Sequence, residues 1–212
     1  MHVRNLVIGA ALIVCTAAIT SQVVSQDKGK GAPPAMPQLT PEEQEVMSIC
    51  STIGMPGENH KLLDNRVGKW NGAMKWWMTP DSKPMESTFT SEAKWIYDGR
   101  FISQTVQGEM MPGETFQGQS YMGYDNAEKK FFSTWMDNMS TGLMVSKGTF
   151  DAAKKSFAFT SDMFCPLAKK QVTSRITEKW TDNDHFTMEM YGPWFKTGKD
   201  YKMMEINYTR VK

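Results

Sequence analysis

Four side chains in the middle of the chain could together bind or act on a small molecule: Arg100, Tyr124, Trp135 and Asp137. Trp135 and Asp137 are two positions apart, so in a β-strand they lie on the same face. If that face lines the interior of a barrel, Asp137 is a carboxylate among apolar groups and needs a partner, for which Arg100 is the candidate. Such a carboxylate could serve as a general acid or base. The simpler interpretation is a polar contact that fixes the end of the strand.

Metal chemistry has little support in the side chains that usually ligate ions. The chain has only three histidines and contains neither an HExxH nor a CxxC motif. His185 could ligate iron, but its place beside the Asn183–Asp184 turn favours a position on the barrel rim, and His60 is expected to cap or pack. The 18 methionines could hold copper(I), yet they lack a repeated Met-x-x-Met spacing and suit an apolar interior better. We expect no metal, no cofactor and, without a GxSxG motif, no serine nucleophile.

The N-terminus predicts export. A short basic start and the apolar run 6–19 are followed by small residues that fit signal cleavage before Gln26. Residues 1–25 are therefore interpreted as a signal peptide. A retained membrane anchor is the less favoured alternative, because a span needs about 20 apolar residues. After cleavage, we expect no membrane-spanning segment and a flexible leader over residues 26–40. The mature protein is then periplasmic or extracellular.

Export also bears on the cysteines. Cys15 leaves with the signal peptide, so the mature chain keeps Cys50 and Cys165. Two cysteines in an oxidising compartment can form a disulfide, and the alternative is two separate buried thiols. The sequence leaves both open, because bridging depends on the distance between the two Cα atoms.

The composition favours a folded domain without a charged partner. Lys and Arg number 24 against 23 Asp and Glu, so no net positive field attracts nucleic acid. Hydrophobic residues make up 40% of the chain and include seven tryptophans, which is enough for a packed core.

Two helices are predicted before any strand. Thr40 is a typical N-cap, Pro41 suits the first helical turn, and Glu43 completes a capping box. This helix ends near Gly54. A second short helix is expected over 59–66, with its apolar residues facing inward.

The chain from Gly68 onward predicts an antiparallel all-β domain. Runs of alternating polar and apolar residues are separated by turn residues such as Asp98-Gly99 and Pro112-Gly113. Ten such runs begin near Lys69, Glu86, Phe101, Phe116, Lys130, Leu143, Ser156, Val172, Phe186 and Tyr201. Laid flat, ten hairpin-linked strands would leave two long edges, so we expect closure into an up-and-down β-barrel, with a sandwich as the alternative.

Trp70 and Arg210 lie at opposite ends of this series of strands. Gly68-Lys69-Trp70 opens the first strand and Tyr208-Thr209-Arg210 closes the last. In a closed barrel these strands are neighbours, and a guanidinium can lie on the indole face, a contact worth roughly 0.5–2 kcal/mol. We expect this pair to close the barrel and not to contact a ligand.

The Gly-x-Trp motif with a terminal arginine resembles the calycins, the superfamily of lipocalins and fatty-acid-binding proteins. A longer series of motifs, over about residues 57–212, resembles the bacterial domain of unknown function 1579 family. In this chain the motifs of the series are His60-Lys61-Leu62-Leu63, Val67-Gly68-Lys69-Trp70, Asp98-Gly99-Arg100-Phe101, Phe116-Gln117-Gly118, Met122-Gly123-Tyr124-Asp125, Trp135-Met136-Asp137-Asn138, Gly148-Thr149-Phe150-Asp151 and Tyr208-Thr209-Arg210. Lys69 and Asn138 depart from the usual pattern. The resemblance implies a calycin-like barrel and carries no activity.

The sequence thus predicts one domain over 41–212. The leading hypothesis is non-enzymatic binding of a small apolar molecule inside the barrel, with Arg100, Tyr124, Trp135 and Asp137 at the site. An enzyme that uses Asp137 is one alternative, and a cell-envelope interaction module with a filled barrel is another. Haem binding is less favoured.

Overall fold

The structure is a computed structural model that describes residues 38–111 and 113–212. Its contacts divide the chain into an N-terminal unit that ends at Met55 and a barrel unit that begins at Pro56. The predicted signal peptide and most of the predicted leader lie outside the described residues. Within the described residues, no helix has both the length and the apolar character that crossing a membrane requires.

The described part of the N-terminal unit contains one helix, α2 (Pro41–Gly54). Thr40 Oγ1 accepts a 3.2 Å hydrogen bond from the Glu43 backbone N–H, and Glu43 Oε2 accepts one of 2.7 Å from the Thr40 backbone N–H. This reciprocal pair is a capping box. The helix therefore begins where the sequence predicts.

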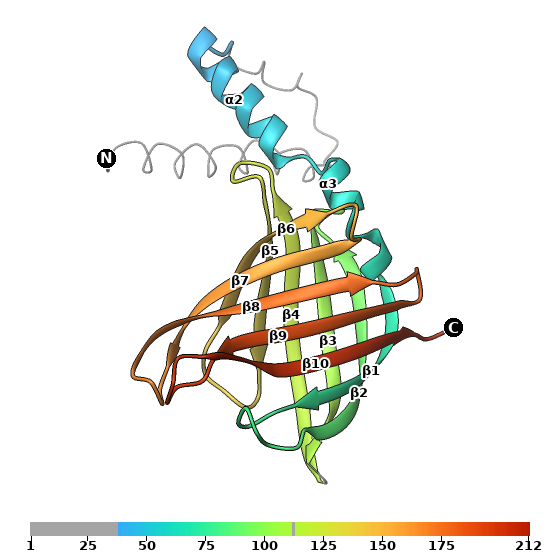
Figure 1. Cartoon of the computed structure of the whole chain (residues 1–212). Helices are drawn as coiled ribbons and strands as arrows, with labels where there is room; N and C mark the ends of the chain where they lie inside the picture. The colour runs from blue at the N-terminus through green and yellow to red at the C-terminus, as the bar shows by residue number, and fades with distance from the viewer. Residues whose placement is uncertain (1–37, 112) are drawn as a thin grey trace, which may run out of the picture. The chain divides into compact units, whose positions relative to one another are not determined.

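The barrel consists of ten antiparallel strands and is closed (Figure 1). The strands are β1 (Gly68–Trp76), β2 (Met85–Ile96), β3 (Phe101–Met111), β4 (Glu114–Asp125), β5 (Lys130–Asp137), β6 (Met144–Asp151), β7 (Ser156–Cys165), β8 (Lys170–Trp180), β9 (His185–Pro193) and β10 (Asp200–Arg210). Each strand pairs with the next along the chain, and β1 pairs with β10, so no edge is left unpaired. The up-and-down barrel is confirmed, and every strand begins within two residues of its predicted start.

The segment before β1 differs from the single helix predicted over 59–66. It contains a short helix, α3 (Glu58–Lys61), and a 3₁₀ turn, η1 (Asp64–Arg66). Because α3 ends at Lys61, Leu62 and Leu63 no longer share an inward face. Leu63 is fully buried, whereas Leu62 is 40% exposed.

Closure of the barrel brings Trp70 and Arg210 together as direct partners in the β1–β10 register. The guanidinium carbon of Arg210 lies 4.2 Å from the centroid of the Trp70 ring. Gly68 has a φ of +132°, and a Cβ there would lie 2.6 Å from Arg210 Nη1, so only glycine suits this position. The guanidinium also donates to the backbone oxygens of Asn65 (2.6 Å) and Val67 (2.7 Å). Arg210 thus joins the last strand to the segment before the first.

Alternate positions of the strands face the interior, called the lumen below. Its packed core lies toward the end of the barrel beside α3 and η1, which we call the helix end. There Phe186 stacks on Trp180 at 4.5 Å and on Tyr208 at 4.2 Å between ring centroids. All three rings are buried. The opposite end, which holds the β1–β2, β3–β4, β5–β6, β7–β8 and β9–β10 turns, is called the open end.

Candidate functional site

The helix end of the lumen is closed by the segment before β1. His60 and Arg66 of this segment are 5% and 6% exposed. Trp70 Nε1 donates a 2.9 Å hydrogen bond to the backbone oxygen of Arg66, and Trp95 Nε1 donates one of 3.0 Å to Asp64 Oδ1. Two strands thus hold the segment in place across this end. A pocket of about 280 Å³ lies between the segment and the turns beside it, with Leu62, Phe150 and Trp180 in its lining.

The open end is different, because inward-facing side chains there are only partly buried. They are Trp76, Met110, Phe116, Trp135, Met144 and Met204. Nearer the helix end, Ile102 and Phe157 are 1% and 0% exposed, although Trp95, Tyr124 and Phe150 there are also only partly buried. A side chain that points into a filled barrel is enclosed on all sides. The partial exposure at one end therefore means that solvent reaches this part of the lumen.

A row of polar side chains crosses the lumen wall between these two ends. It runs over neighbouring strands from β2 to β8 and consists of Ser91, Gln104, Ser120, Ser133, Ser146, Ser161 and Ser174, which we call the hydroxyl belt. Ser133 and Ser146 are direct cross-strand partners, as are Ser161 and Ser174. The sequence alone does not reveal this set, because a serine in a strand suggests an outward position when it is considered by itself.

Most side chains of the belt have hydrogen-bond partners within the protein. Gln104 Nε2 donates to Ser91 Oγ at 3.2 Å, Ser120 and Ser133 lie 3.4 Å apart, and Ser161 donates to a backbone oxygen at 2.9 Å. Ser146 is the exception: it is 0% exposed, and its Oγ has no hydrogen-bond partner among the described residues. A buried hydroxyl without a partner costs about 1–3 kcal/mol. Ser146 is therefore the belt position best suited to meet a polar group of a ligand.

The four predicted site residues divide between the two ends. Arg100 lies in the β2–β3 turn at the helix end, where its Nη1 donates to the Tyr97 backbone oxygen at 3.1 Å. Tyr124 faces the lumen at the same end and contacts His60 edge to face at 5.9 Å and Phe131 at 4.8 Å. These two residues belong to the closed end and not to the entrance.

Trp135 and Asp137 lie at the open end, and Asp137 does not pair with Arg100 as the sequence suggested. Asp137 Oδ2 instead accepts a 2.8 Å hydrogen bond from Trp135 Nε1, and Oδ1 accepts one of 3.0 Å from the Met139 backbone N–H. The Trp135 ring lies across Gly118 of β4, where a Cβ would come within 2.5 Å of it. Because both oxygens of Asp137 are engaged, the geometry favours a contact that orients Trp135 over a proton-transfer role.

The remaining sequence candidates lie away from the lumen entrance. His185 is half exposed, and its Nδ1 lies 2.9 Å from Asp182, a rim position. Cys50 lies in α2 and Cys165 at the end of β7. The structure holds both as thiols, and their pairing under oxidising conditions stays a prediction. Among the described residues, no three His, Cys, Asp or Glu side chains are grouped so that they could hold a metal ion.

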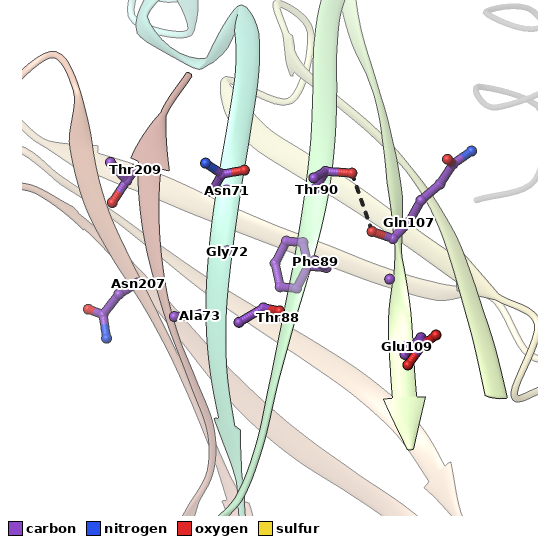
Figure 2. Close-up of a pocket in the computed structure, with 11 residues that line it drawn as sticks. Asn71, Gly72, Ala73, Thr88, Phe89, Thr90, Gln107, Glu109, Asn207 and Thr209 are labelled. Carbon is purple, nitrogen blue, oxygen red and sulfur yellow. Dashed lines mark hydrogen bonds between the residues drawn. The ribbon is translucent and has the colours of Figure 1, made fainter. Parts of the chain in front are cut away.

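A shallow depression of about 570 Å³ lies on the outer wall, across β10, β1, β2 and β3 (Figure 2). Its lining combines outward-facing polar side chains, among them Asn71, Thr88, Thr90, Asn207 and Thr209, with the buried core residue Phe89. These five polar side chains are exposed.

One consequence of the closed helix end is a pH-dependent stability. Burial, followed by the charge of Arg100, lowers the pKa of His60 below its ordinary value of 6.5, against an opposing hydrogen bond with the Tyr124 backbone. The unfolded chain then binds more protons than the folded one just below pH 6.5, so stability falls as the pH drops through that range. Above it, His60 contributes no pH dependence.

Urea unfolding at pH 7.5 and at pH 5.0 checks this expectation. The loss of unfolding free energy on acidification should be smaller in His60→Gln than in the wild type. An equal pH dependence in His60→Gln and in the wild type would contradict the prediction.

Three solved structures are similar to this chain at low sequence identity. The S-type phycobiliprotein lyase CPES from Guillardia theta is 9% identical, with a TM-score of 0.49 over 76% of this chain and 97% of that chain. A redesigned β-barrel is 10% identical, with a TM-score of 0.35 over 72% and 95%. EF1p2_mFAP2b bound to DFHBI is 9% identical, with a TM-score of 0.37 over 72% and 98%. These identities are too low to transfer a function.

A search of the curated proteins finds no match. The profile of a family described as "Protein of unknown function (DUF1579)" matches residues 55–210, which include all ten strands of the barrel. The motifs singled out in the sequence lie within this range. The chain therefore belongs to the DUF1579 family, and its fold is a closed barrel of ten antiparallel strands.

Proposed function

We propose that the protein is exported and binds a small, mainly apolar molecule in the lumen without catalysing a reaction on it. The observation that carries this proposal is the contrast between the two ends. The segment before β1 covers the helix end, whereas six apolar side chains that face the lumen at the open end stay partly exposed. Such a site favours an apolar guest, because binding removes this surface from water.

The lumen also limits the charge that the polar part of the ligand can carry. Its buried charges, Arg66 and Glu178, contact each other at the helix end, and the belt between the two ends is uncharged. A carboxylate bound at the belt would lose its hydration without gaining a cation. A hydroxyl or carbonyl group could pair with Ser146. We therefore favour an uncharged ligand with one hydrogen-bonding group.

Titration with an apolar fluorescent probe tests the site. The probe should bind stoichiometrically, and Trp135→Ala should weaken binding about tenfold, because an aromatic contact of roughly 1–1.5 kcal/mol is lost. Phe132→Ala is the matched control: it also truncates an aromatic side chain of β5, but that ring faces outward against Phe101. Absence of probe binding, or equal weakening in both variants, would rule out the lumen site.

The polar group is tested by displacing the probe with a fatty alcohol or with the fatty acid of equal length. The wild type should prefer the alcohol, and Ser146→Ala should lose about fivefold of its affinity for the alcohol while it binds the probe unchanged. Ser103→Ala, an outward-facing serine on β3, is the control. Native mass spectrometry of the protein from its own host would identify a retained ligand. The intact mass would also reveal whether residues 1–25 are removed, as export requires.

A further inference from the structure

Exposed apolar side chains collect on the turns and strand ends at the open end. The most exposed are Met78 (63%), Met139 (54%), Leu143 (57%), Phe164 (59%) and Leu167 (67%). At the helix end, the four hairpin turns expose a single large apolar side chain, Tyr97. The two ends of the barrel therefore present different surfaces to their surroundings.

Lysines accompany these apolar groups on one side of the open end. Residues 163–170 around the β7–β8 turn and 194–199 in the β9–β10 turn contain four lysines and no carboxylate. The two turns lie side by side (Figure 1), and an ion pair between Arg175 and Asp200 joins their strands. The basic rim, as we call this surface, consists of Phe164, Leu167, Lys169, Lys170, Trp194, Phe195, Lys196 and Lys199.

The positive charge of the basic rim is not neutralised by the protein. None of its four lysines forms an ion pair with another described residue. Lys196 Nζ lies 5.9 Å and 5.8 Å from the ring centroids of Trp194 and Phe195, so a cation stands beside two partly exposed rings. The nearby carboxylates are engaged, since Asp162 accepts from Thr173 and Asp200 pairs with Arg175.

We propose that the basic rim docks the open end of the barrel on a lipid bilayer that contains anionic lipids. Aromatic and aliphatic side chains enter the interfacial region of a bilayer, and lysines beside them attract anionic headgroups. A nucleic acid or an acidic protein would match the charge but would leave Phe164 and Leu167 without an apolar partner. The bilayer satisfies both parts of the surface at once.

Docking would also place the lumen entrance against the membrane. Met144 and Trp135 at the entrance belong to the same end of the barrel as the basic rim. An apolar ligand could then pass between bilayer and lumen without crossing water. This consequence rests on the proposed ligand-binding function, whereas docking itself does not.

Vesicle sedimentation tests docking with the protein in the form that its host produces. The protein should bind vesicles of phosphatidylcholine with about 30% phosphatidylglycerol in low salt, and binding should fall at about 0.5 M salt, where charges are screened over about 3–5 Å. The double variant Lys169→Glu/Lys170→Glu should lose at least tenfold of this binding. Phe164→Ser/Leu167→Ser should also weaken it, in high salt as well as in low salt.

The control reverses the charge of an equivalent pair of lysines at the helix end. Lys129 has a φ of 53° and precedes the first residue of β5, just as Lys169, also with a φ of 53°, precedes the first residue of β8. Lys129→Glu/Lys130→Glu should bind vesicles like the wild type. Absence of binding to anionic vesicles, or equal loss in both double variants, would overturn docking through the basic rim. Probe binding in solution would be unaffected by either result, so failure of docking and failure of ligand binding are distinguishable.

Discussion

Replacing Arg210 by alanine should destabilise the barrel by about 3 kcal/mol, which lowers the melting temperature by roughly 6–12 °C. Besides its contact with Trp70, the guanidinium donates to the backbone oxygens of Asn65, Val67 and Asn183, the last at 2.8 Å. Its removal leaves these acceptors without their donor and opens a gap beside the indole ring. Thermal or urea unfolding followed by circular dichroism gives the measurement.

Arg210→Lys separates charge from shape. Lysine keeps the positive charge but lacks the planar group that stacks on Trp70 and donates in several directions. We expect it to recover less than half of the loss. An Arg210→Ala variant as stable as the wild type would contradict the closing role of this residue, and full recovery by lysine would assign the effect to charge alone.

The second large effect is expected at the buried pair of Arg66 and Glu178. Their side chains are 7% and 14% exposed. Burial lowers the pKa of Arg66 to about 10, so it stays charged at neutral pH. Arg66→Met would leave the Glu178 carboxylate buried without its cation, at a cost of about 3–5 kcal/mol. Urea unfolding at pH 7 measures this loss.

Two variants make the second prediction specific. Arg66→Met/Glu178→Leu removes both charges and should regain most of the stability, because neither group is left unpaired. Arg175, which lies on the same strand as Glu178, forms an exposed ion pair with Asp200. Arg175→Met breaks this pair and should lower the unfolding free energy by less than about 1 kcal/mol. If Arg66→Met costs no more than Arg175→Met, the buried pair does not stabilise the closed end.

The strand count and the closure follow from local features of the sequence. Turn residues such as Asp98-Gly99 set the strand boundaries, and alternation sets the buried face. With ten hairpin-linked strands, pairing of the first with the last is the way to remove both edges, so the neighbourhood of Trp70 and Arg210 was predictable. Helix α2 was also predictable from local sequence, because its capping box involves residues only three positions apart.

The site was less predictable, and the error at Arg100 has a simple geometric cause. Odd-numbered strands run in the same direction, so Arg100, just before β3, and Asp137, at the end of β5, lie at opposite ends of the barrel. Both residues suit a buried ion pair by type. How far apart they lie depends on the direction of each strand and on the position of each residue along it, and neither residue type encodes this.

Sequence alone therefore determined what depends on neighbours along the chain: strands, turns, the capping box and the closed order of the barrel. The tertiary structure alone decided what depends on register across many strands. The hydroxyl belt is the clearest case, because Ser91 and Ser174 belong to one row only after each intervening strand pair has taken its own register. A shift of one residue in any pair would turn a serine outward. Each register is set by packing of the whole lumen, so the row exists only in the assembled barrel.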